Sequence, residues 1–122
     1  MTALLTEHIT TAATLLQAAK DGDAEAFDAA NDAWYRNARQ IARFLHEANA
    51  ENWPFREMST MMRDHLDLTL AEAVARFEGH YHREVLRYDA VHDEILQMAD
   101  MLSTGIVRQF PDRFLGYPTA VS

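Results

Sequence analysis

The chain contains two similar halves, and this internal repeat limits what it can fold into more than any other feature. When residues 1–46 are aligned without a gap on residues 58–103, nine of the 46 pairs are identical. The matches keep a histidine, a glycine and an aspartate at the same separations, with His8 on His65, Gly22 on Gly79 and Asp32 on Asp89. Repetition at a fixed period indicates one structural unit used twice. We therefore expect two copies of that unit related by a pseudo-twofold axis, with the two histidines face to face.

Each half is expected to form a pair of helices, because its apolar residues recur every three or four positions. The predicted helices span about residues 2–20, 24–48, 55–78 and 81–104, and the first and third end at glycine. No strand pattern is visible. The predicted fold is all-α, an antiparallel four-helix bundle built from two repeated helical hairpins at residues 2–48 and 55–104. An apolar tail, residues 106–122, is expected to pack across one end of the bundle or against a second subunit.

Composition restricts the class of protein. The 122 residues suffice for a single domain, 1–122, with one core. Cysteine is absent, which excludes a disulfide framework and a thiolate metal site and fits a reducing compartment. The net charge of −8 argues against nucleic acid as a partner, because phosphates require a basic surface. Neither a signal peptide nor a membrane span is recognisable. The sequence predicts a soluble cytoplasmic protein that binds neither nucleic acid nor membrane.

Three histidines lie on the apolar faces of three predicted helices at a similar depth. His8 and His65 stand at the same distance in sequence before Gly22 and Gly79, the glycines at which their helices are expected to turn. Their antiparallel neighbours are expected near positions 36 and 93, in one layer roughly 20 Å from the hairpin turns at 1.5 Å per residue. His92 belongs to that layer. We therefore expect the three imidazoles to converge in the core.

A layer of histidines with acids nearby indicates a metal site, because neutral imidazole is the commonest protein metal ligand. Asp89 stands three residues before His92 on the same helical face, a spacing used in carboxylate-bridged bundles. The predicted metal is a divalent transition ion, Zn(II), Fe(II) or Cu(II). The predicted ligands are His8, His65, Asp89 and His92. Additional ligands, or acceptors for the second imidazole nitrogen, are expected among Asp32, Tyr35, Glu7 and Asp64.

Two functions from different classes fit these residues. The first is a metal-binding four-helix bundle, either a metalloenzyme with an open coordination position or a metal carrier. The alternative is a non-enzymatic helical interaction or dimerisation module, whose histidines are core polar groups with hydrogen-bond partners and whose aromatic C-terminal tail forms a homodimer. A single histidine on an apolar face is usually of this second kind. The predicted convergence of Asp89 and His92 with the other two histidines favours the metal.

Several motifs resemble those of one protein family. They are Glu7-His8-Ile9, Met61-Met62-x-x-His65-Leu66-x-Leu68-Thr69, Tyr88-Asp89-x-x-His92-x-x-Ile95-Leu96-x-Met98-Ala99-Asp100 and Gly105-Ile106-x-x-Gln109-Phe110-Pro111. In these motifs, which span nearly the whole chain, the sequence is similar to an uncharacterised family of small bacterial four-helix-bundle proteins. The resemblance implies a helical fold and singles out His8, His65, Asp89 and His92, and it implies no particular reaction. Many members also carry an N-terminal helical pair with a further acid–His motif that is not found in these 122 residues.

Overall fold

The computed structural model describes residues 1–79 and 81–115, and of residues 81–85 it describes the backbone alone. This part of the chain forms the helices α1 (Thr2–Asp21), α2 (Ala24–Ala48), α3 (Phe55–Phe77) and α4 (Tyr81–Gln109), followed by the short 3-10 helix η1 (Pro111–Arg113). It contains no strand. The predicted all-α four-helix bundle is confirmed.

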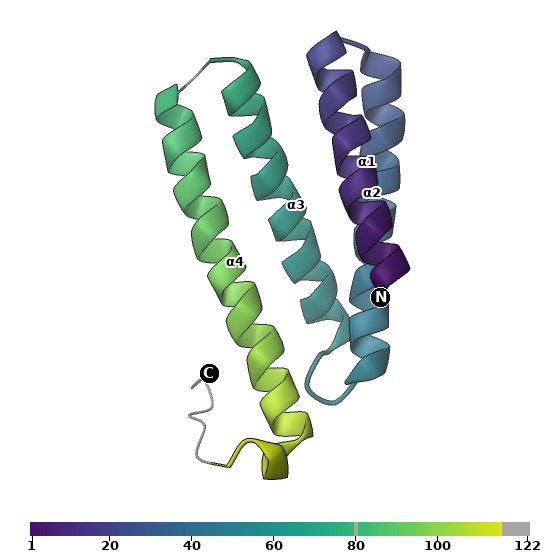
Figure 1. The fold of residues 1–122 in the computed structure, drawn as a ribbon, viewed down its shortest axis with the longest axis vertical. Coiled ribbons are helices and arrows are strands. Elements are labelled where there is room, and N and C mark those ends of the chain that lie inside the picture. The colour runs from purple at the N-terminus through teal and green to yellow at the C-terminus, as the bar shows by residue number, and fades with distance from the viewer. Residues whose placement is uncertain (80, 116–122) are drawn as a thin grey trace.

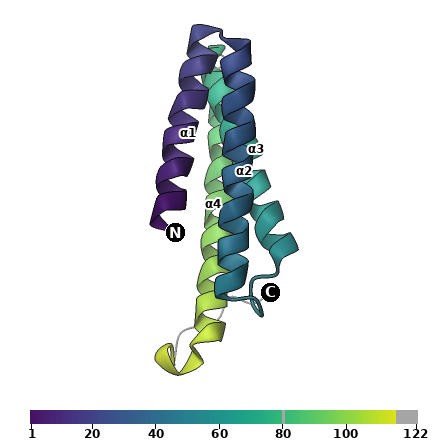
Figure 2. The ribbon, with the colours of Figure 1, turned by 90° about the vertical axis from the view of Figure 1, so that its right-hand side faces the viewer.

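Consecutive helices run antiparallel and lie side by side, α1 on α2, α2 on α3 and α3 on α4 (Figure 1). Figure 2 shows the same arrangement after a 90° turn, with the α1–α2 hairpin in front of the α3–α4 hairpin. Within the described residues α1 and α4 do not form a packed pair. A pseudo-twofold axis would map the α2–α3 contact onto an equally extensive α4–α1 contact. Because no such contact is formed in the described chain, the predicted twofold relation between the hairpins does not hold.

The two hairpins end their first helices in the same way. Gly22 and Gly79 both have a left-handed backbone, with φ of 70° and 74°, which is costly for residues that carry a Cβ. After α1 the backbone N–H of Gly22 donates to Ala19 and that of Asp23 to Ala18, so two helix-end carbonyls are satisfied. The two glycines are aligned with each other in the repeat. Both hairpins therefore turn at corresponding positions.

The core follows the contact between α2 and α3. Met58 and Leu66 of α3 are completely buried, and Trp34 and Ala42 of α2 belong to the same apolar cluster. Leu15 of α1 joins this cluster. Burial of a large apolar side chain contributes about 1.5–3 kcal/mol. The cluster therefore supplies the main force that holds the two hairpins together.

The prediction that the fourth helix ends near residue 104 is wrong, because α4 continues to Gln109. Gly105 is buried inside this helix, against the indole of Trp53. A Cβ at Gly105 would lie 1.9 Å from Trp53 Nε1. The indole N–H donates to the carbonyl of Met101 at 3.3 Å, and Asn49 Nδ2 donates to the carbonyl of Gly105 at 2.9 Å. Glycine is thus required here for the close approach of the inter-hairpin connection, and it does not end the helix.

The predicted tail, residues 106–122, does not form a single segment in the structure. Residues 106–109 complete α4, and residues 111–113 form η1, which packs on α4. Phe110 and Leu115 are exposed. Residues 116–122 lie outside the described part of the chain, so the predicted packing of the tail is described only as far as Leu115.

We expect Gly105→Ala to destabilise the fold, because the added methyl group must displace the Trp53 ring. The expected loss in the free energy of unfolding is about 1–3 kcal/mol, the usual range for overpacking. Urea denaturation followed by circular dichroism measures it. Ser103→Ala, at an exposed position of the same helix, is the control and should change stability by less than about 0.5 kcal/mol. Equal effects of the two substitutions would contradict the proposed contact.

Candidate functional site

His8 of α1 and His65 of α3 come together between the two hairpins. Their ring centroids are 6.5 Å apart, with ring planes inclined by 27°. His8 also stacks on the indole of Trp34 from α2, with centroids 5.5 Å apart. The indole Nε1 of Trp34 is buried and has no hydrogen-bond partner among the described residues. Two of the predicted ligands are therefore neighbours in a half-buried site with an aromatic wall.

Each imidazole is held by one hydrogen bond from the second helix of its own hairpin. His8 Nδ1 lies 2.8 Å from Asn37 Oδ1, and His65 Nδ1 lies 2.9 Å from Glu94 Oε2. The partners are 29 residues apart in both pairs, so Asn37 and Glu94 are aligned in the repeat just as the two histidines are. The hairpins thus hold their histidines in the same way, one residue beyond the predicted neighbours at 36 and 93.

These partners determine which ring nitrogen carries the proton. The amide Nδ2 of Asn37 donates to the carbonyl of Leu4 at 2.9 Å, so its Oδ1 faces His8 as an acceptor. A carboxylate oxygen of Glu94 is likewise only an acceptor. Both Nδ1 atoms are therefore donors, and in the neutral rings both Nε2 atoms keep their lone pairs. The pair offers two imidazole Nε2 atoms to a ligand.

The protonation of His8 is controlled by its surroundings. Burial lowers the pKa of His8 below its usual value of 6.5, and the positive charge of a protonated His65 lowers it further. The hydrogen bond with Asn37 acts in the opposite direction, and its effect is smaller than that of burial. At neutral pH His8 is therefore held in the neutral form, which is the form that binds metals.

His92 does not join the pair. Its side chain is 59% exposed, its Nδ1 lies 3.9 Å from the carboxylate of Asp93, and its ring stacks on Tyr88 with centroids 6.4 Å apart. The buried positions of α4 in this region are Val91 and Glu94. Since each helical residue is rotated by about 100° from the one before, His92 lies on the next face of the helix. That face is open because α1 and α4 do not pack.

The predicted acidic ligands are also at the surface. Asp89, Asp32 and Glu7 are all exposed. Across residues 1–79 and 86–115, no group of three or more His, Cys, Asp or Glu side chains is arranged to hold a metal ion. From the predicted ligand set, the structure brings together only His8 and His65.

Tyr35 is engaged elsewhere. Its hydroxyl donates to the carboxylate of Asp67 on α3. Burial, with a further contribution from Asp67, raises the pKa of Tyr35 to about 12. Tyr35 is therefore a protonated phenol at neutral pH, and its structural role is to link α2 and α3.

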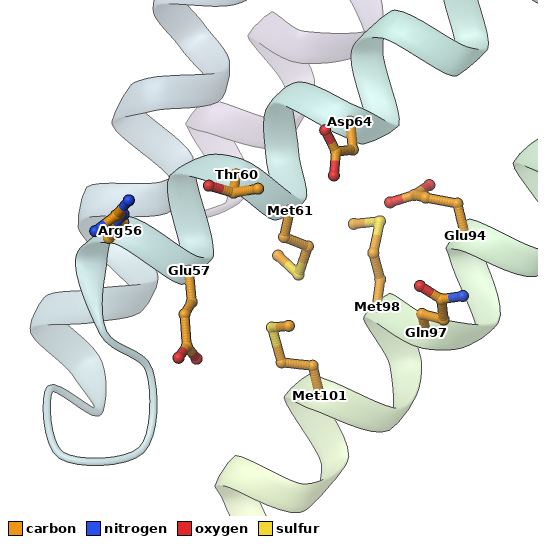
Figure 3. Close-up of a pocket in the computed structure, with 9 residues that line it drawn as sticks. All are labelled: Arg56, Glu57, Thr60, Met61, Asp64, Glu94, Gln97, Met98 and Met101. Atoms are coloured by element: carbon orange, nitrogen blue, oxygen red, sulfur yellow. The ribbon is translucent and has the colours of Figure 1, made fainter. Parts of the chain in front are cut away.

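A cavity of about 470 Å³ lies between α3 and α4. Figure 3 shows the carboxylates of Asp64 and Glu94 directed into the space between the two helices, with Met61, Met98 and Met101 also extending into it. Glu94 thus has two roles, because one of its oxygens also holds His65 Nδ1. A molecule or ion in this cavity therefore reaches the hydrogen-bond partner of His65.

Asn37 and Glu94 were not among the predicted site residues. The signal for them is nevertheless present in the sequence, because both carry a side-chain oxygen, both lie one position from the expected antiparallel neighbours, and the repeat aligns them with each other. Residues at corresponding positions of a repeat that differ in charge and share an acceptor oxygen are candidates for the same structural role.

Comparison with protein-family models, curated proteins and solved structures found no match to this chain. Among the described helices, none is long and apolar enough to cross a membrane. The function must therefore be inferred from the geometry of the site.

We expect the stability of the protein to depend on pH through His8. Because the pKa of His8 is lower in the folded chain than in the unfolded chain, the unfolded chain binds more protons between the two values. Stability is therefore full above about pH 6.5 and is lost as the pH falls from there towards the folded-state pKa. Urea denaturation at about pH 7.5 and about pH 5.5 measures this loss.

The variant His8→Gln keeps a donor for Asn37 and removes the titrating group. Its loss of stability over the same pH range should be smaller than that of the wild-type protein. An identical loss in the two proteins would mean that other groups carry the pH dependence.

Proposed function

We propose that this protein binds a divalent transition metal through Nε2 of His8 and Nε2 of His65. The observation that carries the proposal is the matched pair of hydrogen bonds, which engages both Nδ1 atoms and leaves both Nε2 atoms available. Histidines that bind metals almost always donate their second N–H to a carboxylate, a carbonyl or water. Glu94 supplies a carboxylate and Asn37 an amide carbonyl.

The separation of the two rings supports this proposal. With a zinc–nitrogen bond of about 2.0–2.1 Å, two imidazoles on one metal hold their ring centroids roughly 5–6 Å apart. The observed separation is 6.5 Å. Metal binding therefore requires the two rings to move closer together than they stand in this structure. Because burial favours neutral His8, binding at neutral pH displaces no proton from this ring.

The proposed centre is incomplete with two protein ligands. A structural zinc site has four protein ligands, whereas catalytic and transfer sites leave positions open. A two-histidine centre therefore fits either a metal carrier or a metalloenzyme, with water in the open positions. Zn(II), Fe(II) and Cu(II) all accept imidazole and oxygen ligands. Asp89 and His92 are left out of this centre because they lie on exposed faces of α4.

A second candidate function is a helical interaction module, in which the two hydrogen bonds only satisfy polar groups of the core. The exposed apolar side chains of α1 and α4, among them Leu5, Ile9 and Ile95, favour it. A homodimer through the aromatic tail belongs to this candidate, and Phe110 and Leu115 are exposed there.

Metal content distinguishes the two candidates. The protein is expressed without a metal-affinity tag, loaded with Zn(II), dialysed and subjected to elemental analysis. His8→Ala and His65→Ala should each lose most of the zinc, because each removes one of two Nε2 ligands. His46→Ala, the control, removes a histidine whose Nδ1 bonds the carbonyl of Trp53 away from the site and should retain the zinc. A wild-type protein with less than about a tenth of an equivalent, and with no gain in melting temperature when Zn(II), Fe(II) or Cu(II) is added, would exclude the metal centre.

The role of Glu94 can be tested separately. Glu94→Ala removes the acceptor that orients His65 and should weaken zinc binding about 10- to 100-fold. Glu94→Gln keeps an acceptor oxygen, as Asn37 does in the first hairpin, and should bind more tightly than Glu94→Ala. Competition with a chelator measures the dissociation constants. Asp64→Ala, which removes the other carboxylate shown in Figure 3, is the control and should bind as the wild-type protein does.

A further inference from the structure

Two helical faces of this chain are exposed, although their counterparts in the repeat are buried. On α1, Leu5 is 47% exposed and Ile9 is 69% exposed, whereas Met62 and Leu66, at the corresponding positions of α3, are 5% and 0% exposed. We call the residues Leu5, Ile9, Ala12 and Leu16 the α1 row, in which Ala12 is partly buried against the core of its own chain and the other three are exposed. They recur at spacings of four and three and so occupy one face of the helix.

The same difference separates α4 from α2. Ile95 is 46% exposed, whereas its counterpart Ala38 is 3% exposed. His92 is exposed, and its counterpart Tyr35 is partly buried at the contact with α3. The α4 row is defined as Tyr88, His92, Ile95, Ala99 and Ile106, which again share one face of the helix.

The buried counterparts meet each other inside the chain. Ala38 and Ala42 of α2 and Met62 and Leu66 of α3 belong to one core cluster, at the contact that joins the hairpins. The α4 row thus corresponds to the surface of α2 that packs on α3. The α1 row corresponds to the surface of α3 that packs on α2. The two rows therefore correspond to two surfaces that pack on each other. Within one described chain, however, α4 and α1 do not pack together.

The composition of α1 also indicates that this helix is covered. Charged residues make up 25% of the chain, but from Thr2 to Ala19 the only one is Glu7. Five of the eight polar positions in this stretch are threonines. A helix packed against one neighbour exposes most of its surface and is usually rich in charge, whereas the centres of protein interfaces are depleted in charge.

We propose that a second copy of this chain covers both rows, with the α4 row of each copy packed on the α1 row of the other, in a closed twofold dimer. This contact repeats the α2–α3 contact of the single chain, so the four hairpins of the dimer form one continuous series. Twofold closure uses both rows of both copies, which leaves no row open for further growth. His92 then faces Thr10 of the second copy, as Tyr35 faces Asp67 within the chain.

The dimer also adds ligands to the site. His8 and His65 are neighbours across the α2–α3 contact. Repetition of that contact places His8 of the second copy beside His65 of the first. The centre that is incomplete in one chain then receives imidazoles from both copies. This step rests on the proposed metal function, whereas the dimer itself rests only on the two rows.

Sedimentation equilibrium of the metal-free protein tests the dimer. At micromolar concentrations we expect twice the chain mass of 13.9 kDa. A monomer would overturn the proposal. A mass that rises past the dimer with concentration would overturn twofold closure.

Two neighbouring residues of α4 give a matched pair of variants. Ile95 and Leu96 are 46% and 52% exposed, but only Ile95 belongs to the α4 row. Ile95→Glu should be monomeric with unchanged helical circular dichroism, and Leu96→Glu should remain dimeric. The same state in both variants would overturn the assignment of the interface.

A mixing experiment tests the pairing of unlike rows. Ile9→Glu and Ile95→Lys should each be monomeric alone. Mixed in equal amounts they should form a dimer, because one of the two contacts is then unaltered and the other pairs opposite charges. An interface of α1 with α1 would leave Ile95→Lys dimeric, and one of α4 with α4 would leave Ile9→Glu dimeric; either result would overturn the proposal, as would failure of the mixture to dimerise.

The shared metal centre is tested on the monomeric Ile95→Glu variant loaded with Zn(II). Loss of most of its zinc relative to Leu96→Glu supports a centre built from both copies. Zinc content equal to that of Leu96→Glu would confine the centre to one chain and overturn the shared site, while the sedimentation results for the dimer stand.

Discussion

The apolar contact between α2 and α3 is the interaction on which the rest of this structure depends. It joins two hairpins, each of which has its own turn and its own histidine hydrogen bond. The core cluster at this contact includes Trp34 and Leu66. The same contact sets His8 of one hairpin beside His65 of the other, since these residues lie on α1 and α3. Hydrophobic burial therefore brings the two imidazoles together, and the hydrogen bonds with Asn37 and Glu94 orient them.

The two halves of the site are similar in geometry and different in charge. Asn37 gives His8 a neutral acceptor that is itself fixed by Leu4, whereas Glu94 gives His65 an anionic acceptor in a buried position. A carboxylate partner makes imidazole a better donor of electrons to a metal than an amide does. The two nitrogens presented to a ligand are thus unlike. An exchange of Asn37 and Glu94 would reverse this asymmetry without altering the spacing.

Local patterns predicted the helices and the hairpin register well, because both depend on residues close in sequence. The glycine turns and the antiparallel neighbours of His8 and His65 were placed within one residue. This shift of one position matters, because the neighbours of His8 and His65 are the hydrogen-bond acceptors Asn37 and Glu94 and not residues 36 and 93. The long-range features were not predictable in this way. In the sequence Gly105 resembles a helix end, and only its contact with Trp53 explains a glycine inside α4. The predicted convergence of His92 with His8 and His65 required α4 to pack on α1, which depends on the angle between the hairpins.

The anchoring of the connection between hairpins also has a consequence for the order of folding. Each hairpin is made of local contacts, whereas the bonds of Trp53 to Met101 and of Asn49 to Gly105 join residues 48 and 56 positions apart. Closing loops of this length costs more entropy than forming a hairpin, so contacts of this kind form late. We therefore expect the two hairpins to form first, and the hydrogen bonds of Trp53 and Asn49 with α4 to form last. The two tryptophans then report on different events, Trp34 on the collapse of the core and Trp53 on the final docking of the connection.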